Sequence, residues 1–198
     1  MIRAMQELRI QQHFIDSADL QYQVSEVLAK PLDAAVQALL ASVTGGGKVL
    51  VAGLGASMAL AQYLSSLLVG GFERERPGLA ALTLGADAVW ATAWPGEDAL
   101  ARQVQALGHA GDVLVLVSAH GEEVPLVLAV QAAHEREMTV LAITGGTGGA
   151  AAKALRETDV HVCVPHERAA RVREVQQLAL HCLCDGIDAQ LLGEQEPM

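Results

Sequence analysis

The stretch that decides the fold is residues 48–57, with the sequence KVLVAGLGAS. It opens with a short apolar run, which is typical of a strand buried on both faces. Two glycines, Gly53 and Gly55, follow, and a helical pattern begins at Ser57. A buried strand, a glycine-containing loop and a helix in this order are typical of a parallel sheet with both faces covered.

The same alternation of short apolar runs and helical patterns continues to the end of the chain. Strands are predicted at 48–52, 79–84, 112–117, 139–144 and 160–164. Helices are predicted at 57–69, 98–107, 122–135, 150–155 and 167–192. We therefore expect a three-layer α/β/α domain with a five-stranded parallel sheet over residues 45–192.

The first 44 residues form a separate N-terminal segment in this interpretation. Leu8, Ile15 and Tyr22 share one apolar stripe at helical spacing. Lys30-Pro31 predicts a break between two helices, because proline suits the first turn of a new helix. We expect the segment 1–44 to pack on the core and to take part in an oligomer interface, and residues 193–198 to form a flexible tail.

Composition excludes several classes of protein. The 198 residues are 52% hydrophobic and 18% charged, which is too apolar for a disordered chain. The sequence contains no run of about 20 uncharged apolar residues, so it predicts no membrane span. The net charge of −10 argues against direct binding to nucleic acid. The N-terminus has no apolar signal-peptide region, and three cysteines without a C-x-x-C favour the cytoplasm.

Two loops occupy the place where ligands bind in open parallel sheets, outside the carboxyl ends of the strands. The first contains Gly53, Gly55 and Ser57 at the start of a helix, where free backbone N–H groups attract anions. The dinucleotide-binding fingerprint fails, because its third glycine falls at Met58. The alternative is a plain tight turn with Ser57 as the helix N-cap.

The second loop follows the third strand and contains Ser118, His120 and Gly121, which could contact a ligand. Glu122 and Glu123 follow at once. Their carboxylates would fill an anion site and repel a phosphate about 4 Å away by roughly 1 to 4 kcal/mol per charge pair. No spacing typical of a metal site is present, and the sequence predicts neither a metal nor a cofactor.

Several short stretches carry a resemblance to a known family. They are FERERP at 72–77, VQALGHAGDVL at 104–114, RVREV at 171–175 and CLCDGID at 182–188. With the glycine loop, they resemble sugar-isomerase (SIS) domains of the phosphoheptose isomerase group. Within that group the chain is most similar to the DnaA initiator-associating (DiaA) subgroup.

Two departures from the isomerase pattern argue against isomerase activity. The position of the glutamate used for proton transfer holds Leu67, and that of the last-helix histidine holds Gln176. Leucine takes no proton, and isomerisation needs a positioned base. His181 lies five residues further on and about 140° around the helix, so it is interpreted as a packed helix residue. We therefore expect no catalytic residues.

The resemblance implies a non-catalytic homotetrameric adaptor that binds the replication initiator DnaA and promotes its assembly at the origin. Leu191 and Leu192 match the pair through which that subgroup contacts DnaA. Two alternatives stay open: a phosphosugar-binding protein without turnover, and a phosphoheptose isomerase acting on sedoheptulose 7-phosphate.

Overall fold

The computed structural model describes residues 2–87 and 92–193, with side chains from Met5 onward. Most of the expected tail, from residue 194 on, lies outside this range. The elements in chain order are α1 (Ile2–Thr44), β1 (Val49–Gly53), α2 (Ser57–Gly70), β2 (Ala81–Thr83), α4 (Ala99–Leu107), β3 (Val113–Val117), α5 (Val124–Glu135), β4 (Thr139–Gly145), α6 (Gly149–Ala154), β5 (Val160–Val164) and α7 (Ala169–Leu192).

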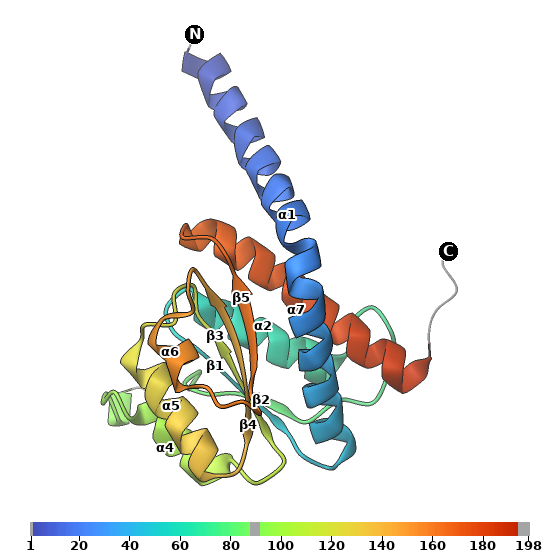
Figure 1. Cartoon of the computed structure of the whole chain (residues 1–198), viewed down its shortest axis with the longest axis vertical. Coiled ribbons are helices and arrows are strands. Elements are labelled where there is room, and N and C mark those ends of the chain that lie inside the picture. The colour runs from blue at the N-terminus through green and yellow to red at the C-terminus, as the bar shows by residue number, and fades with distance from the viewer. Residues whose placement is uncertain (1, 88–91, 194–198) are drawn as a thin grey trace.

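All five strands form one parallel sheet in the order β2-β1-β3-β4-β5 (Figure 1). The predicted architecture, three α/β/α layers around a five-stranded parallel sheet, is confirmed. The chain order reverses between β1 and β3, which makes the carboxyl ends of these two strands the expected ligand position.

Alternate residues of each strand face opposite layers, as the two-residue period of a strand requires. Val49, Val51 and Val115 belong to a core shared with α1, α2 and α7. Leu50 and Leu114 belong to a second core shared with α4 and α5. Both faces of the sheet are therefore covered by helices.

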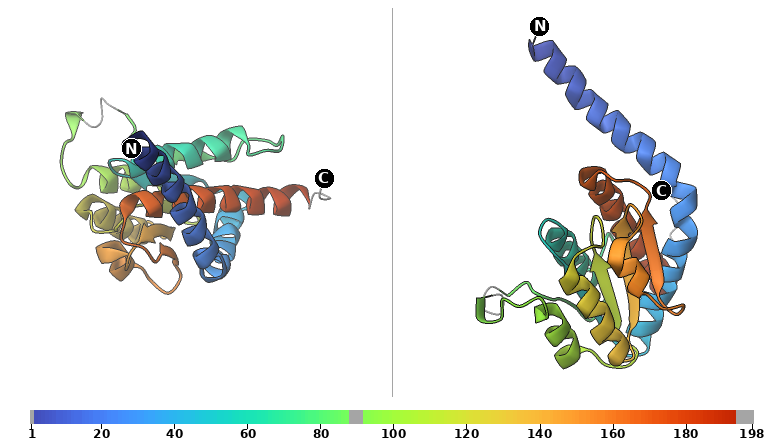
Figure 2. Two further views of the ribbon diagram at one scale, coloured as in Figure 1. Left: turned by 90° about the horizontal axis from the view of Figure 1, so that it is seen from above. Right: turned by 60° about the vertical axis from the view of Figure 1, so that its left-hand side comes forward.

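The N-terminal segment differs from the expected pair of helices, because α1 continues through Pro31 to Thr44. Proline removes one helical hydrogen bond and bends a helix, but it does not end the helix when the following turn is held by packing. Val36 and Leu39 supply that packing, since both are buried in the core. Figure 2 shows that α1 changes direction part way along its length.

The first half of α1 projects from the body of the molecule (Figure 1). Its first buried side chain is Leu20, whereas large apolar side chains before and just after it are 50% to 84% exposed. These exposed residues are Met5, Leu8, Ile10, Phe14, Ile15 and Tyr22. Among the described residues, α1 is the one helix whose length and composition would allow it to cross a membrane. A single such helix is weak evidence of a membrane span.

Candidate functional site

Two loops meet at the carboxyl ends of β1 and β3, and we call them together the strand-end site. Gly53 of β1 lies opposite Val117 of β3 in the parallel register. The chain therefore leaves both strands at the same level, into the Gly53–Ser57 turn on one side and the Ser118–Glu123 turn on the other. These are the two loops in which the sequence predicts ligand contacts, and the structure brings them to the same end of neighbouring strands.

The first loop is built for close packing of the backbone. A Cβ on Gly53 would lie 2.6 Å from the carbonyl oxygen of Ser57, and Gly55 has a φ of +54°. Ser57 is buried, and it is the first helical residue of α2 instead of its N-cap, which is Ala56. The geometry thus matches a tight turn, with the Ser57 side chain turned into the protein.

Ser118 is the centre of the second loop. Its hydroxyl oxygen accepts hydrogen bonds from the backbone N–H of His120 at 3.1 Å and of Gly121 at 2.7 Å. The same hydroxyl donates to the Glu123 carboxylate, at 2.7 Å from Oε2 and 3.0 Å from Oε1. Ser118 is fully buried beneath these groups, and the His120 side chain is exposed.

Gly121 holds this loop against the start of α6. It has a φ of +74°, and a Cβ there would lie 2.2 Å from the carbonyl oxygen of Gly148. The Gly121 carbonyl also accepts a hydrogen bond from the backbone N–H of Ala151 at 2.8 Å. A glycine is therefore required both by backbone conformation and by space.

A small apolar recess of about 200 Å³ adjoins the glycine loop. Its walls include Leu54, Met58, Trp94 and Pro125. The Trp94 indole N–H donates to Asp98, and Arg102 lies 4.0 Å from the ring centroid. The recess offers an apolar surface beside the polar Ser118 loop, and its residues come from four segments, so sequence spacing alone did not group them.

Gln176 and Leu67 occupy very different surroundings. Gln176 is fully buried, and its amide donates to the carbonyl oxygens of Ser118 at 2.7 Å and Ile143 at 3.1 Å. It ties α7 to the ends of β3 and β4. Leu67 is half-buried and packs against the core beneath α2. Neither side chain can transfer a proton.

The structure adds a titratable pair that sequence reasoning missed. Tyr63 Oη and His181 Nε2 are 2.9 Å apart, across 118 positions of sequence. Phe72 stacks on the His181 ring, with centroids 5.4 Å apart. The imidazole is thus hydrogen-bonded by one neighbour and stacked on another, and histidine is the side chain that most often acts as a general acid or base.

Metal-ligand and thiol chemistry find little support in residues 2–87 and 92–193. Within this range there is no group of three or more His, Cys, Asp or Glu that could hold a metal ion. Burial, with a contribution from Asp188, raises the pKa of the Cys184 thiol to about 12. Burial also raises the pKa of Cys182. Both thiols are therefore protonated near neutral pH and are poor nucleophiles.

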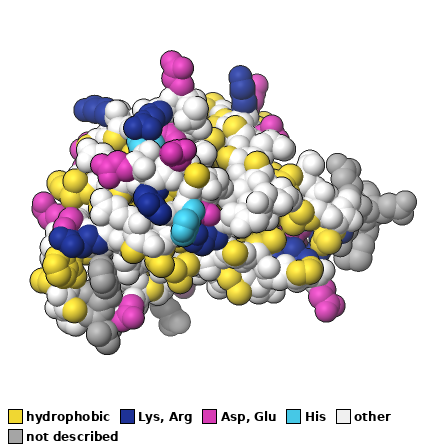
Figure 3. Space-filling model, turned by 90° about the horizontal axis from the view of Figure 1, so that it is seen from below, with side chains coloured by type: hydrophobic (Ala, Val, Ile, Leu, Met, Phe, Trp, Pro, Cys, Tyr) yellow, Lys and Arg dark blue, Asp and Glu magenta, His cyan; other side chains and the backbone are white. Residues whose placement is uncertain are grey.

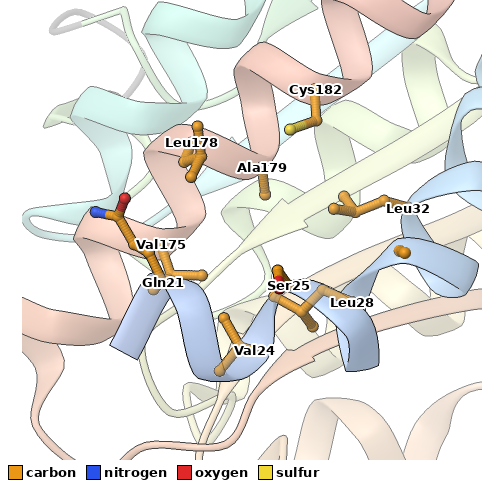
Figure 4. A pocket seen from close by; sticks show the side chains of 10 residues that line it. Gln21, Val24, Ser25, Leu28, Leu32, Val175, Leu178, Ala179 and Cys182 are labelled. Atoms are coloured by element: carbon orange, nitrogen blue, oxygen red, sulfur yellow. The ribbon is translucent and has the colours of Figure 1, made fainter. Parts of the chain in front are cut away.

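An apolar groove of about 310 Å³ runs between α1 and α7 (Figure 4). Val24, Leu28 and Leu32 line it from α1, and Leu178 and Cys182 line it from α7. Its lining residues all come from these two helices, and none belongs to the two loops of the strand-end site.

On the face of the molecule seen in Figure 3, basic and acidic side chains are interspersed, and neither charge is concentrated in one place.

Leu191 and Leu192, the last two residues of α7, are 37% and 41% exposed.

Comparison with known proteins places this geometry in context. A family model described as "SIS domain" matches residues 12–145. A phosphoheptose isomerase of Methylibium petroleiphilum is 55% identical over 197 residues, covering 97% of this chain and 98% of the relative. One of Aromatoleum aromaticum is 44% identical over 192 residues, covering 95% and 97%.

Solved structures agree with the sequence relatives. The phosphoheptose isomerase GmhA of Neisseria gonorrhoeae superposes with a TM-score of 0.86 at 38% identity, covering 92% of this chain and 99% of that one. A phosphoheptose isomerase from Francisella tularensis gives 0.87 at 36% identity, covering 91% and 96%.

These relatives overturn the expectation of a non-catalytic adaptor for DnaA. Proteins up to 55% identical over nearly the whole chain are named as isomerases, so that interpretation is wrong. Its weak step was to treat Leu67 and Gln176 as proof that no acid–base group is present, since the fold brings Tyr63 and His181 together. The expectation that Leu191 and Leu192 contact DnaA rested on that interpretation, and none of these relatives supports a DnaA partner.

Proposed function

Because this chain belongs to the SIS-domain family, we propose that it is a sugar-phosphate isomerase of the phosphoheptose isomerase type. The observation that carries the proposal is the similarity to proteins of that name over 97% of the chain. The expected substrate is sedoheptulose 7-phosphate, and the expected reaction interconverts a ketose and an aldose.

The ligand site in this proposal is the strand-end site. Gly53 and Gly55 bring the backbone close to a ligand at the start of α2, and the Ser118–Gly121 turn faces them across β1 and β3. Ser118, His120 and Gly121 remain the proposed contacts to the sugar phosphate. Ser57 is a further proposed contact. Its side chain is buried, as is that of Ser118, so a ligand reaches either hydroxyl only after neighbouring groups move.

Aldose–ketose isomerisation moves a proton between neighbouring carbon atoms, so it needs a group that can accept and return a proton. His181 is the residue we assign to this step, with Tyr63 as the group that holds its ring. The assignment is supported by their 2.9 Å hydrogen bond and by the stacking of Phe72. The pair is connected to the strand-end site through its two helices, since α2 begins at Ser57 and α7 carries Gln176, which bonds Ser118 five residues before His181.

A coupled assay of sedoheptulose 7-phosphate conversion tests the proposal. We expect wild-type protein to turn over the substrate, and His181→Ala to lower kcat by about a hundredfold or more, the usual contribution of a general acid or base. Tyr63→Phe should lower kcat less, because the imidazole remains. Gln177→Ala, an exposed change on the same helix, is the matched control. Absence of turnover by purified wild-type protein would refute the isomerase function.

The organisation of the chain is proposed on the same basis. Residues 1–44 form a segment that joins copies of the chain into a homotetramer, and residues 45–192 form the catalytic domain. The exposed apolar face of α1 and the groove beside it support this role. Three unpaired cysteines support the prediction of a reducing, cytoplasmic location.

A further inference from the structure

The hydroxyl of Ser118 has no hydrogen left for a ligand. A serine hydroxyl offers one donor and two acceptor positions. The donor goes to the Glu123 carboxylate, and the acceptors take the backbone N–H groups of His120 and Gly121. A phosphate oxygen needs a donor, so Ser118 can bind one only after Glu123 has moved.

Glu123 is directed into this loop instead of capping its own helix. It immediately precedes α5 at the N-cap position, yet its side chain makes no capping hydrogen bond. The start of a helix favours negative charge, and the Glu123 carboxylate supplies that charge from within the protein. The carboxylate thus holds the position that a ligand anion would take beside Ser118.

We propose that Glu123 determines which ligands the strand-end site accepts, by occupying the anion position on Ser118 so that a phosphate group must displace it. The inference rests on the proposed function, which supplies a sugar phosphate as the ligand. It predicts weak affinity for free phosphate. Ligands must therefore gain binding energy through their sugar portion, for which the adjoining recess of Leu54, Met58 and Trp94 offers a surface.

Glu122 provides a matched control, because it is the neighbouring residue and carries the same charge. Its side chain is exposed, and within the described residues the Ser118 hydroxyl is bonded by Glu123 and not by Glu122. Substitution of either residue changes the net charge equally. Only substitution of Glu123 frees the Ser118 hydroxyl.

Calorimetric titration with inorganic phosphate measures the effect directly. We expect Glu123→Ser to lower the Kd for phosphate by about tenfold or more, which corresponds to about 1.4 kcal/mol. Glu123→Gln keeps the shape and removes the charge, and should give a smaller gain in affinity. Glu122→Ser should change the Kd by less than about threefold, as expected for an exposed charge.

Equal Kd values for Glu123→Ser and Glu122→Ser would overturn the proposal, as would the absence of phosphate binding in every variant. Glu123→Gln keeps the test decisive if Glu123→Ser does not fold. Turnover of sedoheptulose 7-phosphate by wild-type protein, without tighter phosphate binding in Glu123→Ser, would refute the role of Glu123 alone. Tighter binding without turnover in any variant would support the role of Glu123 and refute the isomerase function.

Discussion

At the scale of single residues, the buried pair Arg76–Asp188 is the interaction most sensitive to substitution. Arg76 Nε and Asp188 Oδ1 are 2.5 Å apart, and both side chains are 1% exposed. Arg76 also donates to the carbonyl oxygens of Leu67 and Leu68 near the end of α2. The pair therefore joins α2 to α7 as well as neutralising two buried charges.

Removal of one partner leaves the other charge buried without compensation, which costs about 3 to 5 kcal/mol. We expect Arg76→Met and Asp188→Asn each to lower the free energy of unfolding by about that amount in urea titrations. The exposed pair Arg102–Asp98 is the control, and Arg102→Met should shift the unfolding midpoint far less. A midpoint shift of equal size in both pairs would contradict the argument.

A second prediction at this scale concerns the dependence of stability on pH. Burial disfavours the Asp112 carboxylate, but hydrogen bonds from Lys48 and the backbone of His109 outweigh burial and lower its pKa below 3.8. A lowered pKa in the folded state contributes stability above the unfolded-state pKa. That contribution is lost as pH falls through the folded-state pKa.

We therefore expect Asp112→Asn to be less stable than wild type at pH 7, measured by urea unfolding. The difference should shrink as the pH falls below about 3.8, because wild-type Asp112 then becomes protonated as well. A difference that is constant with pH would show that the carboxylate charge plays no part.

The chemistry of single residues could be foreseen only where neighbours in sequence are neighbours in space. The sequence places Glu123 five positions after Ser118, and the structure brings the Glu123 carboxylate onto the Ser118 hydroxyl, whereas the Glu122 side chain is exposed. Tyr63 and His181 lie 118 positions apart, and no periodicity links them. The pairing depends on how α2 packs beside α7, so it required the structure.

At the scale of elements, the Ser118–Glu123 turn contains one position that only glycine can occupy. Gly121 combines a φ of +74° with a Cβ position 2.2 Å from the carbonyl oxygen of Gly148. Gly46 has a similar φ of +84°, but among the described residues nothing lies within 4 Å of its Cβ position. Comparison of the two positions therefore separates the free-energy cost of a positive φ from the free-energy cost of a steric clash.

We expect Gly46→Ala to lower the free energy of unfolding by about 1 to 2 kcal/mol, the cost of a left-handed conformation for a residue with a side chain. Gly121→Ala should cost more, because the Gly148 loop must also shift. Thermal melting of both variants measures the difference. Equal losses would mean that the loop yields freely and that φ alone matters.

The elements themselves were predictable to within two residues for most of the chain. β5 begins and ends as expected, because its alternating valines lie between Asp159 and Pro165, residues that disfavour a strand. The exception is α1, where Pro31 predicted a break that the structure does not contain. Local propensity was outweighed there by tertiary packing of Val36 and Leu39, which sequence alone does not reveal.

At the scale of the whole molecule, the projecting half of α1 requires an explanation. An isolated helix is marginal in water, and most helical stability in proteins comes from packing an apolar face. Phe14 and Tyr22 are 75% and 84% exposed on this half. The groove between α1 and α7 is a surface of matching character on the same molecule. In a symmetric oligomer, the α1 helices of different copies would cover one another.

We therefore expect light scattering during gel filtration to give a mass of four times 20.7 kDa for the wild-type protein. Phe14→Ser combined with Tyr22→Ser should reduce that mass, because it removes two large apolar side chains from the contact, and such residues dominate interface energies. Gln11→Ser with Gln23→Ser alters exposed polar positions of the same helix and should leave the mass unchanged. An unchanged mass in both double variants would mean that the copies associate through another surface, whereas a monomeric wild type would mean that they do not associate. If the predicted mass is found, far-ultraviolet circular dichroism of the Phe14/Tyr22 variant should also show a loss of helix, since the projecting half of α1 then keeps only its polar contacts to α7, such as Ser17–Glu174.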